Sequence, residues 1–505
     1  MTGGGIIALV AYGAQNVILS GNPQMTYFYK AFKRYSHFAT ENITIAMDGP
    51  NELNFDAPVQ LRAKIPRFGD LVSDMYFVFR IPDIYSKFVD ISGRDAQYEF
   101  QWSEYLGAAI IQSAAFFVGG QKIQEVDGTQ LLSRALLDYD QDMFHKWKGL
   151  VGQVPELTRP ATGSFSAPGG AYPTVFPSTA TPQLNRPSIF GRDIYVPLGF
   201  WFTEDPAQAL PLVGLQYHDC EVQLTLAPIS RLYTVLDISG YRVNPTYIMD
   251  ATPSAVQQNL PNYGASSDTS VQIRNFFTDI GYTVPPMNSW FINPRLEATF
   301  VYLPEDEQVI FASRPLSYII TQVTSYPFPG LFSRQVLDLY THNPITRLTL
   351  IQHRSDYLQR NDFANFTNWC NWPTAPYSPN PDAPFSSGLL LPNAQIDMIR
   401  AVRILCDGNE IQEQKPVEFF SKLSTFRYTS GIGQEGLPIY SFQLHSPTTQ
   451  PSGSINASRI RNFQIEVDVY PLPAETTYTY DLRIYVENIN WFEVASGMGG
   501  LKYAL

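Results

Sequence analysis

One segment of this chain occurs twice, and that duplication limits the fold more than any other feature. Residues 117–135 (FVGGQKIQEVDGTQLLSRA) align without gaps on residues 405–423 (LCDGNEIQEQKPVEFFSKL), 288 residues later. The two copies share a glycine, an Ile-Gln-Glu run and a serine. Each copy has the pattern of a strand, a glycine turn, a second strand and the start of a helix. The repeat therefore predicts two domains of similar structure in tandem.

Most segments of the chain alternate between apolar and polar residues with a period of two. The alternation is clear in residues 222–226 (VQLTL), 296–303 and 463–469. This is the pattern of half-buried strands in antiparallel sheets, so we predict an all-β sandwich class. One stretch differs, because the apolar residues from Leu131 to Trp147 recur every three to four positions. That spacing predicts a single amphipathic helix inserted in the β scaffold.

The spacing of the repeats also predicts where the long loops lie. The strand at 222–226 matches 465–469 in pattern, but the offset is now 243, so the first copy contains about 45 additional residues. A proline-rich loop near 150–190 accounts for them, and a second proline-rich loop spans 372–384. We therefore predict four parts, which are an N-terminal arm (1–28), a first domain with the long loop (29–240), a connecting segment (241–288) and a second domain with the C-terminal tail (289–505).

Charge and composition exclude several classes of function. The net charge is -12 and the chain contains no long basic run, which argues against direct binding of nucleic acid. Only 16% of residues are charged whereas 14% are aromatic, so we expect much of the surface to be covered in an assembly. The three cysteines are widely spaced and odd in number, which fits a reducing compartment. The first 29 residues carry no charge but are too polar for a membrane-spanning helix, and no signal peptide is expected.

Three motifs invite a chemical interpretation, and each has a structural one that we favour. The glycines at 431, 433 and 436 have GxGxxG spacing, but the sequence around them does not open a helix, so we expect a loop between strands. His218 and Cys220 could face one side of a strand, but we expect Cys220 to be a buried structural thiol. The acidic run at 305–307 follows a strand, and we expect a solvated hairpin turn instead of a cation site. No catalytic, cofactor-binding or metal-ligating residue is therefore predicted.

Three sequons offer candidate sites of a different kind. They are the glycosylation acceptors Asn42 (NIT), Asn365 (NFT) and Asn456 (NAS). Such triplets arise often by chance, so they remain candidates only.

Five blocks of the sequence resemble the major capsid proteins of nucleocytoplasmic large DNA viruses, the family that includes phycodnaviruses, iridoviruses and mimivirus relatives. The blocks occur in the family's order, at residues 9–28 (LVAYGAQNVILSGNPQMTYF), 194–224, 294–307 (PRLEATFVYLPEDE), 450–460 (QPSGSINASRI) and 496–503 (SGMGGLKY). The resemblance implies two eight-stranded jelly rolls in tandem and no enzymatic activity. It also implies homotrimeric capsomers of pseudo-hexagonal outline that tile the icosahedral shell of a large dsDNA virus.

The resemblance also implies where the protein acts and what it contacts. We expect assembly in the host cytoplasm, a final location in the virion, and contacts with neighbouring trimers and with minor capsid and penton proteins. The uncharged arm is a candidate contact to an inner membrane layer. The alternative is a β-sandwich carbohydrate-binding or glycosidase-like protein, which would require aromatic platforms for sugar or two carboxylates facing one cleft.

Overall fold

The computed structural model describes residues 3–86, 88–89, 97–98, 100–160, 187–236, 242–245, 273–277, 289–368, 396–446, 450–472 and 478–503. The chain divides into a short N-terminal unit, residues 1–39, and a large unit, residues 40–505. Both predicted proline-rich loops fall mostly outside the described residues, as does most of the predicted connecting segment.

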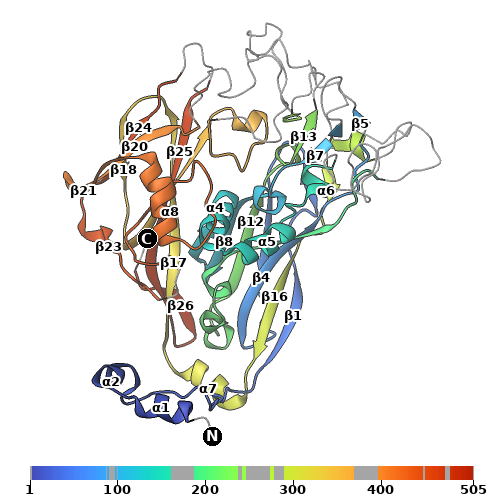
Figure 1. Cartoon of the computed structure of the whole chain (residues 1–505). Coiled ribbons are helices and arrows are strands. Elements are labelled where there is room, and N and C mark those ends of the chain that lie inside the picture. The colour runs from blue at the N-terminus through green and yellow to red at the C-terminus, as the bar shows by residue number, and fades with distance from the viewer. Residues whose placement is uncertain are drawn as a thin grey trace. The chain divides into compact units, whose positions relative to one another are not determined.

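The first domain of the large unit is a sandwich of two antiparallel sheets (Figure 1). One sheet has the order β1-β16-β4-β10 and the other has the order β3-β12-β8-β9. The short strand β11 also pairs with β4. The bounds are β1 (Ala39–Ala46), β3 (Val59–Lys64), β4 (Leu71–Arg80), β8 (Ile111–Val118), β9 (Gln121–Val126), β10 (Asp193–Pro197), β11 (Leu210–Pro211), β12 (Cys220–Leu226) and β16 (Arg295–Tyr302).

The second domain repeats this architecture strand for strand. Its sheets have the orders β17-β25-β19-β22 and β18-β24-β20-β21, and the short strands β23 and β26 pair with β19 and β25. The bounds are β17 (Leu316–Leu331), β18 (Gln335–Leu339), β19 (Pro344–Arg354), β20 (Ile399–Cys406), β21 (Asn409–Pro416), β22 (Ile439–Ser441), β23 (Ile455–Asn456), β24 (Phe463–Val469), β25 (Tyr480–Ala495) and β26 (Met498–Leu501).

The two strand orders correspond along the chain, so the structure confirms both the all-β class and the internal repeat. The duplicated segment forms β8, β9 and a helix in the first domain, and β20, β21 and a helix in the second. The second pair of matching segments forms β12 and β24, which occupy the same place in their sheets. Two four-stranded sheets connected in this order make a jelly roll. The chain therefore contains two eight-stranded jelly rolls in tandem, counted over the described residues.

Smaller strands and helices occupy the loops of the sandwiches. The remaining strands pair as β2 (Glu52–Asn54) with β15 (Ser289–Phe291), β5 (Phe88–Val89) with β6 (Gln97–Tyr98), and β13 (Tyr233–Leu236) with β7 (Phe100–Trp102) and β14 (Arg242–Val243). The α-helices of the large unit are α3 (Leu106–Ala109), α4 (Gly128–Asp138), α5 (Gln141–Leu150), α6 (Pro155–Thr158), α7 (Glu305–Ser313) and α8 (Ser424–Tyr428), and the π-helical turn η8 (Phe419–Leu423) continues directly into α8. The 3-10 turns of the described residues include η1 (Trp201–Thr203) and η7 (Tyr357–Gln359).

The structure corrects the predicted boundary between the two domains. Residues 289–302 were assigned to the second domain, but β15 pairs with β2, and β16 pairs with β4 in the first jelly roll. The last strand of a jelly roll returns to lie beside its first strand, so β16 closes the first sandwich next to β1. The second jelly roll begins only with β17, after helix α7.

Two local predictions were also wrong. The helix predicted from Leu131 to Trp147 is two helices, because Tyr139 adopts an extended conformation and Asp140 begins α5 by accepting a hydrogen bond from Met143 N at 2.7 Å. The acidic run at 305–307 is not a hairpin turn. It forms the first turn of α7, where carboxylates interact favourably with the helix dipole.

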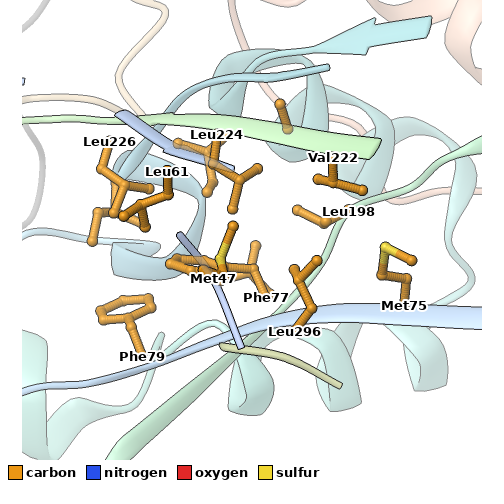
Figure 2. Close-up of a cluster of buried hydrophobic side chains, with 14 of the residues drawn as sticks. Met47, Leu61, Met75, Phe77, Phe79, Leu198, Val222, Leu224, Leu226 and Leu296 are labelled. Carbon is orange, nitrogen blue, oxygen red and sulfur yellow. The ribbon is translucent and has the colours of Figure 1, made fainter. Parts of the chain in front are cut away.

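The core of the first jelly roll lies between its two sheets. Figure 2 shows Leu61 on β3 and Leu224 on β12 facing Phe77 on β4 and Leu296 on β16, and all four side chains are buried. The alternation read from the sequence explains this packing, since every second side chain of β12 points into the core. The second jelly roll has a separate core of the same kind.

The N-terminal unit contains two short helices, α1 (Gly4–Val10) and α2 (Ala14–Ser20), and its described residues are exposed. Among the helices that the structure describes, none combines the length and the hydrophobicity needed to cross a membrane.

Candidate functional site: the junction between the two jelly rolls

A third hydrophobic cluster joins the two jelly rolls. Helices α4 and α5 of the first roll contribute one side of it, including Leu132, Leu136 and Trp147. The second roll contributes Ile351 on β19 and Tyr485 on β25. These side chains are almost completely buried, so the two sandwiches are joined by an apolar cluster distinct from the core of each.

A buried ion-pair network crosses the same junction. Arg347 on β19 donates to Asp138 Oδ2 at 2.8 Å, at the end of α4, and to Glu487 Oε2 on β25 at 3.0 Å. The Arg347 side chain is 3% exposed and that of Asp138 is 1% exposed. Burial alone would lower the pKa of Arg347, but the two carboxylates outweigh it and raise that pKa. A charge this deep is stable only with these partners.

The glycine-rich loop caps the C-terminus of α4. The N–H of Gly431 donates to Leu137 O at 2.7 Å, and the N–H of Gly433 donates to Leu136 O at 2.9 Å. The last carbonyls of a helix lack partners within the helix, and this loop supplies donors to two of them. A Cβ at position 431 would lie 2.3 Å from Leu136 O, so only glycine fits there. The prediction of a loop is confirmed, but the loop connects helix α8 to strand β22 and not two strands.

Two edge strands meet along the seam between the rolls. Gln124 on β9 donates to Thr321 O on β17 at 3.2 Å, and Gln322 on β17 donates to Ile123 O on β9. Each amide oxygen is also used, because Gln124 Oε1 accepts from Trp201 N and Gln322 Oε1 accepts from Asn490 Nδ2, both at 2.9 Å. The two glutamines are therefore fixed in reciprocal orientations and link strands that would otherwise be free edges.

A cavity of about 510 Å³ opens beside this seam. Its carboxylates already have structural partners. Asp127 caps α4 through Gln130 N at 2.7 Å and accepts a hydrogen bond from Tyr485 Oη, while Glu125 pairs with Lys122. Burial raises the pKa of Asp127, and the cap, Tyr485 and Arg483 act in the opposite direction. The cavity is thus lined by groups that hold the junction together.

The other predicted motifs have structural roles. Cys220 is buried, and burial raises its pKa to about 12, so the thiol stays protonated. His218 lies 2.9 Å from Gly499 O through Nδ1 and helps to hold the C-terminal strand β26. Within the described ranges, no group of three or more histidine, cysteine or acidic side chains could share a metal ion.

The three sequons differ in accessibility. Asn456 is exposed, and its Oδ1 accepts from Ser458 N at 3.1 Å. Asn42 is exposed on β1, and its Nδ2 lies 3.5 Å from Thr299 Oγ1. Asn365 is half-buried and accepts from Thr367 N at 3.0 Å. Glycosylation at these positions stays a prediction.

Sequence reasoning did not find the junction residues, although one signal was present. The α4 segment GTQLLSRALLD has apolar residues on more than one side of the helix. A helix that packs on its own sandwich needs one apolar face, so a wider apolar surface indicates a second partner.

Comparison with known proteins agrees with this architecture. A family model described as "Major capsid protein N-terminus" matches residues 26–264, and one described as "Large eukaryotic DNA virus major capsid protein" matches residues 307–500. The chain is 24% identical to the major capsid protein of Chrysochromulina ericina virus, over 99% of this chain and 100% of that protein. It is 26% identical to the major capsid protein of Paramecium bursaria Chlorella virus 1, over 99% of each chain.

Solved structures share the fold. The PBCV-1 VP54 structure superposes with a TM-score of 0.66 at 20% identity, covering 95% of this chain and 100% of that one. The Faustovirus major capsid protein gives a TM-score of 0.63 at 14% identity, covering 97% and 96%. Because the two family models together match most of the chain, and full-length relatives agree, this chain belongs to the major capsid proteins of large eukaryotic DNA viruses.

Proposed function

We propose that this chain forms homotrimeric capsomers of pseudo-hexagonal outline, which tile the facets of an icosahedral shell around a large dsDNA genome. The observation that carries the proposal is the strand-for-strand equivalence of the two jelly rolls, which are joined by a buried apolar junction. Three such chains would present six similar sandwiches around one axis. A cyclic trimer is closed by symmetry, whereas contacts between trimers stay open and can propagate as a layer.

The mass of the purified chain in solution tests this proposal. Light scattering should give a mass near three times 56.9 kDa, and negative-stain images of the same peak should show hexagonal particles. A stable monomer across micromolar concentrations would contradict the trimer.

The proposed role is mechanical and requires neither catalysis nor a cofactor. Each contact is modest, but many repeated contacts sum to a rigid shell. The net charge of -12 supports a shell that encloses the genome without binding it directly.

Assembly in the host cytoplasm is supported by Cys220 and Cys406, which are free thiols. A particle preparation that digests glycans at a rate dependent on this chain would overturn the non-enzymatic role.

The N-terminal arm is the proposed contact to minor capsid and penton proteins or to an inner membrane layer. Residues 3–28 are uncharged and exposed, with large apolar side chains such as Leu19 and Phe28. Deletion of residues 2–24 should leave soluble trimers that fail to enter particles. Normal incorporation of the shortened chain would overturn this part of the proposal.

Among the sequons, Asn42 and Asn456 are exposed and Asn365 is half-buried, so the environment of Asn365 supports a glycan least. Mass spectrometry of peptides from purified virions should find a larger glycosylated fraction at Asn456 than at Asn365. An unmodified Asn456 peptide beside a glycosylated Asn365 peptide would reverse the order.

A further inference from the structure

The second jelly roll leaves exposed the surface that the first jelly roll buries. In the strand order, β21 and the helical segment η8–α8 occupy the places that β9 and α4 occupy in the first roll. Ile123 on β9 is 0% exposed, whereas its counterpart in the repeat, Ile411 on β21, is 37% exposed. Ala135 on α4 is 0% exposed, whereas its counterpart Leu423 is 52% exposed. The first surface is covered by the second roll, and the second surface has no such cover in the single chain.

The difference in exposure between the two rolls is largest at the ends of the two helices. Extending the repeat by three residues places Phe426 at the position of Asp138. Asp138 is buried against Arg347, whereas Phe426 is 87% exposed. Ile432, in the loop that follows α8, is 58% exposed. A phenylalanine, a leucine and two isoleucines from consecutive elements are therefore exposed, and exposed apolar side chains in such numbers are of the type that partner proteins cover.

The first jelly roll has the complementary free edge. Within the chain, β9 packs on β17, which is the terminal strand of its sheet. The strand that holds the same terminal place in the first roll is β1. Thr40, Asn42 and Thr44 on β1 are exposed.

We propose that β21, the segment η8–α8 and Ile432 of one copy dock on the first jelly roll of a second copy, at the sheet whose edge strand is β1. Within the chain, β9 packs in this way on the edge strand β17, and α4 packs on β19 and β25 of the same sheet. This inference rests on the proposed homotrimer and assigns its contact surfaces. The two patches differ, so each copy donates one and receives one. Such a head-to-tail contact closes into a ring of three when successive copies are related by a threefold axis. Gln412, the counterpart of Gln124, then donates to a backbone carbonyl of β1.

A single substitution in the full-length chain tests the apolar part of this surface. Phe426→Asp should convert trimers to monomers at micromolar concentration, with at least a tenfold rise in the concentration needed for association. Far-UV circular dichroism and thermal unfolding of the monomer should not change, because the side chain is exposed. The matched control is Phe332→Asp, which changes a phenylalanine that is 60% exposed in the loop after β17 and should remain trimeric. A trimeric Phe426→Asp variant would overturn the inference.

Site-specific cross-linking tests the edge assignment independently. A photoreactive amino acid at position 411 should give intermolecular cross-links that map to residues 39–46. Cross-links that map elsewhere within an intact trimer would overturn this pairing but leave the homotrimer standing. A wild-type chain that is monomeric would overturn both.

Discussion

The first and second jelly rolls share one strand order, but the corresponding edges have opposite environments. In the first roll, β9 and α4 are buried against the second roll through glutamine bonds, an ion-pair network and a shared apolar cluster. In the second roll, Ile411 on β21, Leu423 on η8 and Phe426 on α8 are exposed, and the last two are apolar side chains larger than Ala135 at the first of these helical positions in the first roll. The fold therefore does not decide which edge is covered. The side chains at equivalent positions decide it, as Ala135 and Leu423 illustrate.

The chemistry of the covered edge suits a contact that forms once, during folding of a single chain. A buried arginine between two carboxylates is costly to desolvate and tolerates few geometries, so we expect it to fix the relative orientation of the two rolls. The exposed edge has Phe426 where the covered edge has Asp138. Exposing a phenylalanine to water before assembly costs little free energy. Burying a charge without a partner in the assembled interface would cost much more.

The largest expected effect comes from removing Arg347. Arg347→Met leaves Asp138 and Glu487 as unpaired carboxylates in a buried junction, and we expect a loss of about 4 kcal/mol in the free energy of unfolding. Urea denaturation monitored by tryptophan fluorescence measures it. If the junction is the affected region, the two rolls should also unfold in separate transitions.

The control for this change is an exposed ion pair. Arg62 pairs with Glu221 on the surface of the first roll, and the Arg62 side chain is 58% exposed. Arg62→Met should cost less than about 1 kcal/mol. Equal losses in the two variants would show that the junction network does not have the role we assign to it.

Paired glutamine substitutions compare the two edges directly, with a smaller effect. Gln124→Ala removes the bond to Thr321 O and leaves the N–H of Trp201 without its acceptor, so we expect a loss of about 2 kcal/mol. Gln412→Ala, at the equivalent position, should change the stability of the monomer by less than about 0.5 kcal/mol. If both variants lose the same stability as monomers, the two edges are not different in the way the structure indicates.

The sequence predicted the fold well because its signals are local. Period-two alternation, as in 222–226, determines which side chains a strand buries. The repeat at 117–135 and 405–423 revealed the duplication because the turn glycine and the Ile-Gln-Glu run recur. The family resemblance added the jelly-roll topology, which alternation alone cannot distinguish from other sandwiches.

The predictions from the sequence failed where pairing between distant segments decides the structure. Strand β16 follows a long segment and precedes α7, so nothing local indicates that it returns to β4. The junction was missed for the same reason, since Arg347 and Asp138 are more than two hundred residues apart in the chain. The break at Tyr139 was local, but the apolar spacing continues through it, and the capping residue Asp140 was the only signal.

The last expected effect, about as large as that of Gln124→Ala, is a pH dependence that acts on the second roll and the junction. His353 lies on β19, stacks on Tyr357 at 4.4 Å, and makes edge contact with Phe366 of the junction cluster. Burial lowers its pKa from 6.5 to about 4. The corresponding strand of the first roll, β4, contains no histidine. Acid should therefore weaken the second roll and the junction while leaving the first roll unaffected by this mechanism.

The direction of the pH effect on stability follows from the lowered pKa of His353. Between pH 6.5 and 4 the unfolded chain binds a proton at His353 that the folded chain does not, so stability is lost as the pH falls through this window. After allowance for partial exposure, the loss should be about 2 kcal/mol. His353→Gln, which can still donate to Phe363 O but does not titrate, should remove this part of the pH dependence of urea midpoints. His445→Gln, at an exposed position, should leave it intact. An unchanged pH profile in His353→Gln would mean that acid sensitivity does not distinguish the two rolls, because the proton would then be bound elsewhere.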